Sequence, residues 1–589
     1  MLHEFTQGHR IAYFSMEIAL EYNIPTYAGG LGVLAGDTLR SAADLAMPMV
    51  GVTLVSRAGY FQQKIDSIGR QIELADTWEP AAHAEPVTAK VAVQIERRTV
   101  WVGAWLYRVK SLCGTQVPVI LLDTDLPENH VEDREITHHL YGRDAAYRLK
   151  QEIVLGVGGI RMLQALGFQI RKHHMNEGHS ALLAMELLNR YAYQKRDLRP
   201  GESLYDIPIV RSKCIFTTHT PVEAGQDQFD YDMVERIADG DFMDLQEVRK
   251  LAGQDRLNMT RLALNLSDYV NGVAKRHAEV SQAMFPDYKM HAITNGVHPH
   301  TWTNQFFATL YDKYMPGWRH EPELLVRIDQ VPDQALWDAH INAKQALLER
   351  IEQTTGQVLD PLLPVLGFAR RMTAYKRPDL IFSDLERLRA IAKDKPFHLV
   401  MAGKAHPADE GGKRLIEQIH SHMRELAADL SIVYLPGYDM NLALDLIAGV
   451  DVWLNTPLRP LEASGTSGMK AAFNGVPSLS VLDGWWLEGC IENITGWAVG
   501  EFKNQSNQTS ESCGCIDNTT ENITPDNTTQ TEENDARDLY AKLEHVVLPL
   551  YHDDRAGWIN IMKGAIGKNA AVFNSHRMIR RYAAEAYIK

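Results

Sequence analysis

Two short stretches of the 589-residue chain combine residue types that could bind an anion and act on it. The first runs from Glu462 to Lys470 with the sequence EASGTSGMK and follows the apolar run Val452–Leu454. Small residues at a helix start let backbone N–H groups approach an anion, which the helix dipole also favours there. Lys470 lies about one turn further on, where its amine could meet a carbonyl or phosphate, and Glu462 offers acceptors for sugar hydroxyls. The alternative is a tight helix start with a solvated lysine.

The second stretch is a run of four cations within eight residues, Arg370, Arg371, Lys376 and Arg377, in a chain of net charge −15. It follows the predicted strand 364–368, and ligands of open α/β sheets bind at the carboxyl ends of strands. Planar guanidinium groups and a lysine point charge suit phosphate oxygens. The alternative is a solvated charge run, the usual explanation for such clusters.

Glycine-rich turns occur at two further places. Gly29, Gly30 and Gly32 precede the amphipathic segment 37–45, and glycines before a helix suit phosphate or close ligand approach, although they also serve turns. The run 156–159, Gly-Val-Gly-Gly, looks like a dinucleotide fingerprint. It sits inside a helical pattern with no strand before it, so we predict close helix packing there and no NAD binding.

Polar clusters end three further apolar runs, at 176–179 (NEGH), 217–220 (TTHT) and 294–298 (TNGVH), so all could line one crevice. The pattern leaves open whether His219 is a core or a cleft histidine. The chain has no HExxH, paired-cysteine zinc or Walker sequence, so no metal site is predicted.

Short apolar runs alternate with longer helical patterns along the chain, which predicts an α/β fold of parallel sheets covered by helices. The predicted strands are Ile11–Met16, Met49–Val55, Val117–Leu122, Cys214–Thr217, His291–Thr294, Pro364–Phe368, His398–Met401, Ile432–Leu435, Val452–Leu454 and Ser478–Leu482. The clearest helical patterns are Asp144–Leu166, Ser180–Tyr193, Ala536–His545, Arg555–Ile566 and Ser575–Tyr587. We expect an amino-terminal lobe over 1–297, a second lobe over 298–570, and a final helix in 571–589 that could pack back on the first lobe.

The segment 504–535 consists mostly of Asn, Thr, Ser, Asp and Glu and has no aromatic residue. Such a composition buries too little apolar surface to offset ordering entropy, so we predict a disordered surface insertion. Its CxC pair, Cys513 and Cys515, is a weak metal or redox signal, and no role is the simpler interpretation.

Composition excludes several classes of protein. A charge of −15 and a pI near 5.9 argue against nucleic-acid binding, which depends on clustered Lys and Arg. Five scattered cysteines do not suggest a disulfide framework. The start shows no signal peptide and no run of 18 apolar residues occurs, so we expect a cytoplasmic enzyme without a membrane partner.

Taken together, these motifs resemble the α-glucan phosphorylases, the glycogen and maltodextrin phosphorylase family, in a short form. The resemblance runs from Tyr13-Phe14-Ser15-Met16-Glu17 to the helix at Arg577-Met578, and the stretch 462–470 is its most specific part. It implies two Rossmann-like lobes of the GT-B type, with the active site between them. It also implies reversible phosphorolysis of the terminal α-1,4-linked glucose of glycogen or maltodextrin to α-glucose 1-phosphate, with retention, assisted by the phosphate of pyridoxal phosphate.

The resemblance also implies roles for individual residues. Lys470 would carry pyridoxal phosphate as a Schiff base, with Thr466 at its phosphate and Trp302 and Tyr438 packing around it. Arg371 and Lys376 would hold phosphate and, with His219, form the catalytic set. The remaining implied contacts are the Gly30 amide to the substrate phosphate, and those to the glucosyl unit from His219, Asn295, Glu462, Ser464 and Gly465. The first lobe would bind glucan and the second the cofactor, and a homo-oligomer is left open.

A competing hypothesis is a nucleotide-sugar-dependent α-glucosyltransferase of the glycogen synthase type, which shares the two-lobed scaffold. It too can have a Gly-Gly-Leu-Gly turn and a cation pair after a strand of the second lobe. Lys470 discriminates, because a synthase needs no Schiff-base lysine at that position. A binding protein that keeps the cleft without turnover is disfavoured, because Arg371, Lys376 and Lys470 are all present.

Overall fold

The computed structural model describes residues 3–142, 144–194, 196, 198–199, 202–222, 225–238, 244–500 and 525–588, with only the backbone described for 525–529. The chain divides into two compact units. Unit 1 comprises Met1–Gln62, Leu74–His298 and Ser575–Lys589, and unit 2 comprises Gln63–Glu73 and Pro299–Asn574. Each unit is built on its own large sheet, so the fold is mixed α/β.

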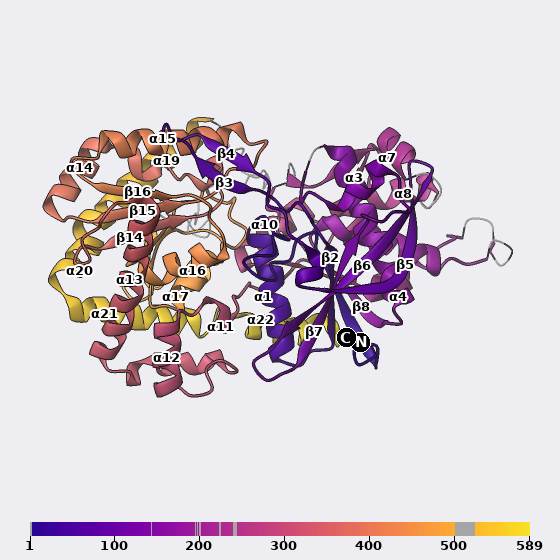
Figure 1. Ribbon diagram of the computed structural model, residues 1–589, viewed down its shortest axis with the longest axis horizontal. Coiled ribbons are helices and arrows are strands. Elements are labelled where there is room, and N and C mark those ends of the chain that lie inside the picture. Colours follow the sequence, from indigo (N-terminus) through magenta and orange to yellow (C-terminus); the bar gives the residue numbers. More distant parts are fainter. Residues whose placement is uncertain are drawn as a thin grey trace, which may run out of the picture. The chain divides into compact units, whose positions relative to one another are not determined.

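The sheet of unit 1 is mostly parallel (Figure 1). Its spatial order is β13 (His291–Ala292), β12 (Tyr269–Gly272), β9 (Cys214–Thr217), β8 (Gln169–Asn176), β1 (His9–Phe14), β2 (Met49–Leu54), β7 (Gln116–Asp123), β6 (Arg98–Lys110) and β5 (Glu85–Ile95). Only the pairs β7–β6 and β6–β5 are antiparallel. β1 lies between β2 and β8, with Ala12 opposite Val50 on one side and His173 on the other. Every residue of β2 is buried, as expected of a parallel strand covered on both faces.

Helices such as α1 (Gly30–Asp44), α4 (Gly159–Ala165), α6 (Ile207–Lys213) and α10 (Lys275–Met284) pack on this sheet. The other helices described in unit 1 are α2 (Val131–Arg134), α3 (Ala145–Ile153), α5 (Leu182–Arg190), α7 (Tyr231–Ile237), α8 (Leu245–Ala252), α9 (Met259–Asn265) and α22 (Ser575–Tyr582). A short antiparallel pair, β10 (Gln228–Asp230) and β11 (Arg256–Asn258), lies beside them.

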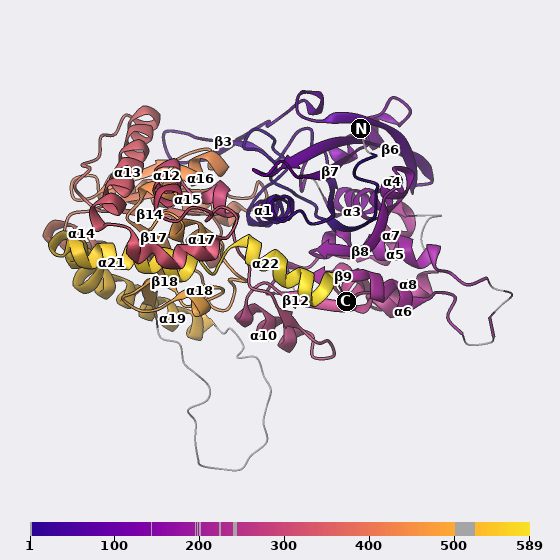
Figure 2. The same ribbon diagram turned by 90° about the horizontal axis from the view of Figure 1, so that it is seen from below.

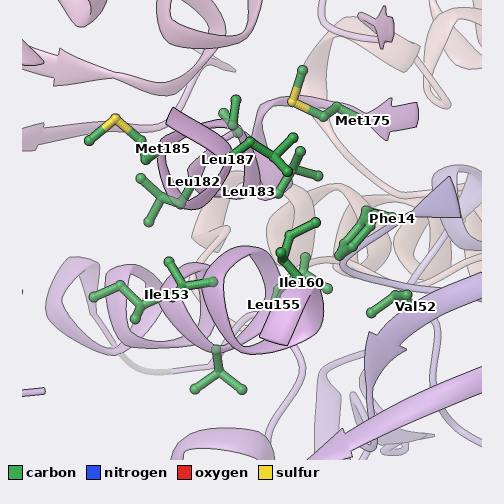
Figure 3. Packing of buried hydrophobic residues seen from close by; sticks show 14 of the residues in the cluster. Phe14, Val52, Ile153, Leu155, Ile160, Met175, Leu182, Leu183, Met185 and Leu187 are labelled. Carbon is green, nitrogen blue, oxygen red and sulfur yellow. The ribbon is translucent and has the colours of Figure 1, made fainter. Parts of the chain in front are cut away.

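The glycine run 156–159 lies inside a helix, as predicted. A π-helical turn over Val154–Gly158 joins α3 to α4 without a break. A Cβ on Gly156 would lie 2.6 Å from the backbone of Leu183, and one on Gly159 would lie 2.6 Å from the ring of Phe14. Figure 3 shows the helix packed against α5 and against side chains of β1 and β2. The glycines therefore serve close packing, and no dinucleotide turn is present at this run.

Unit 2 contains a wholly parallel sheet whose order is β16 (Ser431–Leu435), β15 (His398–Ala402), β14 (Val365–Ala369), β17 (Val452–Asn455), β18 (Ser478–Val481) and β19 (Gly496–Val499). Counted along the chain from β14, this is the order 3-2-1-4-5-6 of the Rossmann fold. The chain runs from β14 to one edge and then returns to the other side at β17. That reversal creates a crevice at the carboxyl ends of β14 and β17, where such folds bind ligands.

Helices α13 (Asp333–Thr355), α15 (Glu410–Glu425), α16 (Met440–Gly449), α17 (Ser467–Ala472) and α19 (Pro525–Lys542) contact this sheet (Figure 1). The other helices described in unit 2 are α11 (Pro299–Trp302), α12 (Gln305–Tyr314), α14 (Leu385–Asp394), α18 (Trp486–Gly489), α20 (Leu548–Asp553) and α21 (Arg555–Gly564). The hairpin of β3 (Gln62–Ile65) and β4 (Gln71–Leu74) joins this unit through side-chain amides. Gln63 donates to the carbonyl of Gly403 and Gln71 to that of Ala405, contacts that a strand pattern does not predict.

The predicted strands all correspond to strands of the two sheets, with ends shifted by a residue or two. The pattern missed β8, β12 and β19, and it missed the antiparallel strands β5 and β6. β8 has a polar sequence, QIRKHHMN, yet its last five residues are buried. Its buried polar side chains form hydrogen bonds with residues distant in sequence, such as that between His174 and Thr217. A pattern of hydrophobic residues does not reveal such contacts.

The predicted disordered insertion 504–535 is wrong at its carboxyl end. α19 begins at Pro525, and Asp535 is fully buried. The Asp535 carboxylate pairs with Arg377 at 2.6 Å and with Arg459 at 2.5 Å. These ion pairs stabilise a polar segment that composition alone marks as unable to fold. The part of the prediction over 504–524 lies outside the described residues.

The last helix, α22, belongs to unit 1 although it follows the whole of unit 2 in sequence. In Figure 2 this yellow helix lies beside β9 and β12. The Tyr582 hydroxyl accepts from the side-chain amide of Asn271 at 3.0 Å and lies 3.1 Å from Oγ1 of Thr217. None of the helices in the described ranges combines the length and apolar character needed to span a bilayer.

Candidate active site

The strand order of the unit 2 sheet reverses between β14 and β17, and we call this place its switch point. The cation run and Glu462 lie together there. Arg370 and Lys376 follow β14, and Glu462 follows β17, the strand beside it. Lys376 Nζ lies 2.6 Å and Arg370 Nη2 lies 2.5 Å from Oε2 of Glu462. Arg370 also donates to Oδ1 of Asn455, the last residue of β17. The two sequence stretches that suggested anion chemistry therefore meet in one cluster.

Glu462 is ionised in this cluster. The side chain is buried, and burial alone would raise the pKa of its carboxyl group. The adjacent Arg370 and Lys376 outweigh burial and lower the pKa to about 2. The backbone N–H of Glu462 donates to Asp483 at 2.9 Å, which fixes the loop that carries it. A carboxylate held in this way accepts hydrogen bonds and cannot donate a proton at neutral pH.

The other two cations of the run differ in their surroundings. Arg377 is buried and pairs with Asp535. Arg371 is exposed, and among the described residues it forms no ion pair. The run thus places four cations against two carboxylates, Glu462 and Asp535, so the cluster retains positive charge that can attract an anion.

Lys470 is held almost out of water. It lies in α17 with 8% of its surface exposed, and its Nζ is 3.8 Å from the ring centroid of Trp302. A Cβ on Gly468 would lie 2.8 Å from Trp485 and 2.9 Å from Oγ of Ser478, so glycine permits α17 to pack closely. A nearly buried amine over an aromatic face fits a lysine that carries a flat aromatic aldehyde.

Four further predicted contacts lie in the same unit. Thr466 is one helical turn before Lys470, whose backbone N–H donates to the Thr466 carbonyl at 3.2 Å. Ser464 is buried, and its Oγ has no hydrogen-bond partner among the described residues, which suits a ligand hydroxyl. Gly465 has a left-handed φ of +76° and packs on Glu462. Tyr438 is half-buried in the loop between β16 and α16.

Unit 1 has a second switch point, between β1 and β8, beside the glycine-rich turn. Glu17 follows β1 and accepts from the backbone N–H groups of Ala28 at 2.6 Å and Gly29 at 3.1 Å. The Tyr141 hydroxyl donates to its other oxygen at 3.0 Å. A Cβ on Gly32 would lie 2.7 Å from Glu17, whereas one on Gly30 would meet no atom within 4 Å. Glu17 therefore fastens the turn at Ala28 and Gly29 and packs closely against Gly32, while the backbone at Gly30 is open.

His219 lies at the end of β9 in the same unit and is a neutral hydrogen-bonding group. Its Nε2 lies 2.7 Å from Oδ1 of Asn176, and its backbone N–H donates to Glu177 at 2.7 Å. Burial lowers the pKa of the imidazole to about 3, with a smaller effect of nearby histidines such as His277. With Nε2–H donated to Asn176, Nδ1 is left as an acceptor.

Asn295 follows β13 and is also buried in unit 1. Its backbone N–H donates to Val273, and its carbonyl accepts from Arg577 at 3.1 Å. Its side-chain Oδ1 has no hydrogen-bond partner among the described residues. A buried amide oxygen in this state suits a ligand hydroxyl.

The predicted site residues thus form two groups, each within one unit. Unit 1 holds Gly30, His219 and Asn295, and unit 2 holds Trp302, Arg371, Lys376, Tyr438, Glu462, Ser464, Gly465, Thr466 and Lys470. Sequence reasoning assigned no individual role to Glu17, Arg370 or Asp535. For Glu17 and Arg370 a signal existed, since each comes within three residues of a central strand's carboxyl end.

Comparison with known proteins gives consistent matches. The family model described as "Carbohydrate phosphorylase" matches residues 202–496. Maltodextrin phosphorylase of Thermococcus litoralis is 36% identical over 621 aligned positions, which cover 98% of this chain and 70% of that protein. Glycogen phosphorylase of Aquifex aeolicus is 34% identical, covering 100% of this chain and 87% of that protein. Glycogen phosphorylase of Mycobacterium tuberculosis is also 34% identical, with 98% and 70% covered.

Proposed function

The chain belongs to the α-glucan phosphorylase family, and from this premise we propose that it cleaves terminal α-1,4-linked glucose from maltodextrin or glycogen with inorganic phosphate. The product is α-glucose 1-phosphate, and the reaction is reversible with retention. The relatives named above are phosphorylases, which disfavours the synthase alternative. The strand order of unit 2 supports the assignment of its sheet to a Rossmann-like lobe of a GT-B enzyme.

The cation cluster of unit 2 is the observation that carries this proposal. A glycoside hydrolase protonates its leaving group with a carboxylic acid whose pKa is raised. Here the central carboxylate, Glu462, has a pKa lowered to about 2 after burial is outweighed by Arg370 and Lys376. It cannot serve as that acid at neutral pH. An orthophosphate bound by cations can both donate the proton and accept the sugar, which is what phosphorolysis requires.

In this proposal, Arg371 and Lys376 hold the phosphate oxygens, and the open backbone at Gly30 donates a further hydrogen bond. Arg371 supplies an exposed guanidinium, and Lys376 an ammonium whose position is set by Glu462. Charged donors arranged before substrate arrives stabilise charge that develops during bond cleavage.

Hydroxyl groups of the glucosyl unit need acceptors and donors that are already in place. Oδ1 of Asn295 and Oγ of Ser464 are buried without partners among the described residues, so each gains a hydrogen bond when a sugar hydroxyl binds. His219, kept neutral by burial and hydrogen-bonded to Asn176, and the packed turn at Gly465 complete this set. The carboxylate of Glu462 has lone pairs left for a hydroxyl beyond its two cation contacts.

Lys470 is the residue that would hold pyridoxal phosphate, with Thr466, Trp302 and Tyr438 beside it. The nearly buried amine over Trp302 and the close packing at Gly468 fit a bound aromatic ring. When bound, the cofactor supplies a phosphate group that can exchange a proton with orthophosphate. The chain's own part is to hold both anions with cations and to keep water away from them.

The proposal is tested by following cofactor and product together. Purified protein should absorb in the near ultraviolet, and borohydride should reduce the imine so that the cofactor stays attached to the chain. The protein should also release glucose 1-phosphate from maltodextrin and phosphate. Lys470→Ala should lose both, while Lys250→Ala, which removes an exposed lysine of α8 paired with Glu247, should keep both. The proposal would be contradicted if the purified wild type carried no pyridoxal phosphate and transferred glucose from a nucleotide sugar.

A further inference from the structure

Two histidines and an aspartate from distant parts of the sequence meet inside unit 1, and none of the three was assigned a role above. Asp44 is the last residue of α1, His298 ends the second segment of unit 1, and His576 lies in the first turn of α22. One ligand atom from each residue lies within 4.8 Å of the other two. His298 and His576 are 4% and 0% exposed, and the Asp44 side chain is 9% exposed. We propose that these three residues form a binding site for a divalent transition-metal ion, with Zn²⁺ as the preferred ion.

The distances suit a shared ion. Oδ2 of Asp44 lies 2.7 Å from Nε2 of His298 and 3.6 Å from Nε2 of His576. Ligand atoms around a tetrahedral Zn²⁺ lie about 3.3 Å apart, given metal–ligand bonds of about 2.0–2.1 Å. Small side-chain rotations therefore bring all three atoms to one ion. The fourth position is left for water, as in zinc sites with three protein ligands.

The ligand chemistry selects among metals. Imidazole nitrogens bind Zn²⁺ and its neighbours well, whereas Mg²⁺ and Ca²⁺ require mainly oxygen ligands. A single carboxylate with two neutral imidazoles also leaves one positive charge on the loaded site. That is a smaller charge to bury than that of an ion held by neutral ligands alone.

The surroundings of His576 orient it as a ligand. Its Nδ1 lies 3.1 Å from Oγ of Ser41, which lies 2.5 Å from Oγ of Ser575. When Nδ1–H donates to Ser41, the lone pair of Nε2 faces Asp44. Metal-bound histidines ordinarily have their second nitrogen held in this way. The N–H of Ser575 also donates to the carbonyl of Val297, so the segments carrying both histidines are tied together.

The sequence has no local zinc motif for these residues because the ligands come from positions 44, 298 and 576. The arrangement without an ion is a buried hydrogen bond between His298 and Asp44 beside His576. The triad therefore has two states, one without an ion and one with a bound metal ion, and the experiment below distinguishes them. It is independent of the cofactor and of phosphorolysis.

The experiment titrates chelator-treated full-length protein with Co²⁺ as a spectroscopic substitute for Zn²⁺. We expect visible ligand-field absorption that saturates at one equivalent per chain, is displaced by Zn²⁺, and accompanies a rise in the thermal midpoint. Asp44→Asn keeps the size of the side chain and an acceptor for His298 but removes the anionic ligand, so this variant should lose the absorption. Ser41→Ala should keep the ligands and weaken Co²⁺ affinity about 10–100-fold.

His298→Gln and His576→Gln should also lose the absorption. The matched control is His545→Gln, which removes an exposed histidine 3.8 Å from Glu544 and should bind Co²⁺ as the wild type does. Wild-type protein that gains no absorption overturns the proposal, whether or not the variants fold. Equal Co²⁺ binding by wild type and Asp44→Asn overturns it too, because the ion would then be adventitious.

Discussion

The ammonium of Lys376 lies 2.6 Å from the carboxylate of Glu462, although the residues are 86 positions apart in sequence. Arg370 approaches the same oxygen, so one carboxylate positions two cations at the switch point of the unit 2 sheet. The pair explains why an acidic protein keeps a dense cation run after β14. In the proposed reaction this arrangement holds Lys376 ready for a phosphate oxygen.

Glu462→Gln keeps the shape of the side chain and removes the charge that Arg370 and Lys376 share. We expect turnover to fall by about 100-fold or more, because a positioned charge contact is lost. The free energy of unfolding should fall by about 3 kcal/mol, the typical cost of breaking a buried ion pair. Since the pKa of Glu462 is about 2, the ratio of wild-type to variant turnover should not change between pH 6 and 8. Glu544→Gln, at an exposed pair with Arg387, is the control.

Arg371→Ala separates phosphate binding from folding. Because Arg371 is exposed and forms no ion pair among the described residues, the free energy of unfolding should change by less than about 0.5 kcal/mol. The value of kcat/KM for phosphate should fall by about 10²–10³-fold. Arg276→Ala, on the surface of α10, should leave kcat/KM unchanged. Normal phosphate saturation in Arg371→Ala would refute the assigned role.

Gly30→Ala and Gly32→Ala should affect different properties. A Cβ on Gly32 would lie 2.7 Å from both Glu17 and Tyr27, so Gly32→Ala should lower the free energy of unfolding by about 1–3 kcal/mol. A Cβ on Gly30 meets nothing, so Gly30→Ala should fold normally and raise the KM for phosphate. Urea unfolding and phosphate saturation measure the two effects. A Gly32→Ala variant as stable as the wild type would contradict the close packing of Glu17 and Tyr27 against Gly32.

Asp535→Asn tests whether α19 is part of the folded core. The fully buried carboxylate pairs with Arg377 and Arg459, and the amide would leave both guanidinium groups without their counter-charge. We expect the free energy of unfolding to fall by about 3–5 kcal/mol. Asp553→Asn, at an exposed pair with Lys395, should cost less than about 1 kcal/mol. Equal stability of the two variants would contradict the buried role of Asp535.

The histidines of unit 1 should make the protein sensitive to acid. Burial lowers the pKa to about 3 or about 4 for a set of described histidines: His173, His174, His179, His219 and His277. Each binds a proton in the unfolded chain below about pH 6.5 and does not in the folded chain, so its stabilising effect is present above that pH. The effect is lost as the pH falls towards the folded-state pKa, by up to about 2 kcal/mol per histidine at pH 5.

The measurement for this prediction is urea unfolding between pH 7.5 and 5. The free energy of unfolding should fall steadily below pH 6.5 in the wild type. His173→Gln removes one of the titrating groups and should reduce the slope by the equivalent of about one proton. A wild-type stability that is constant between pH 6.5 and 5 would show that these imidazoles are not buried in neutral form.

Much of the fold could be predicted because parallel strands have a strong local signal. Fully buried strands such as β2 and β15 are short apolar runs, and each predicted run corresponds to a strand. β8 escaped detection because its buried residues are polar and their partners come from elsewhere. The first part of α19 escaped for the same reason, since Asp535 depends on arginines 76 and 158 positions away, whereas the helical pattern from Ala536 was recognised.

By itself, the sequence determined which residue types are available for chemistry: the lysine of the 462–470 stretch, the cation run, the glycine-rich turn and the family they indicate. These are local patterns, and the physical preferences behind them act over a few residues. Only the tertiary structure decided that Arg370 and Lys376 share Glu462, that Glu17 fastens the turn at Ala28 and Gly29, and that Asp44, His298 and His576 meet. Such contacts follow from the order of strands in a sheet and from the return of α22 to unit 1, and no local pattern in the chain encodes them.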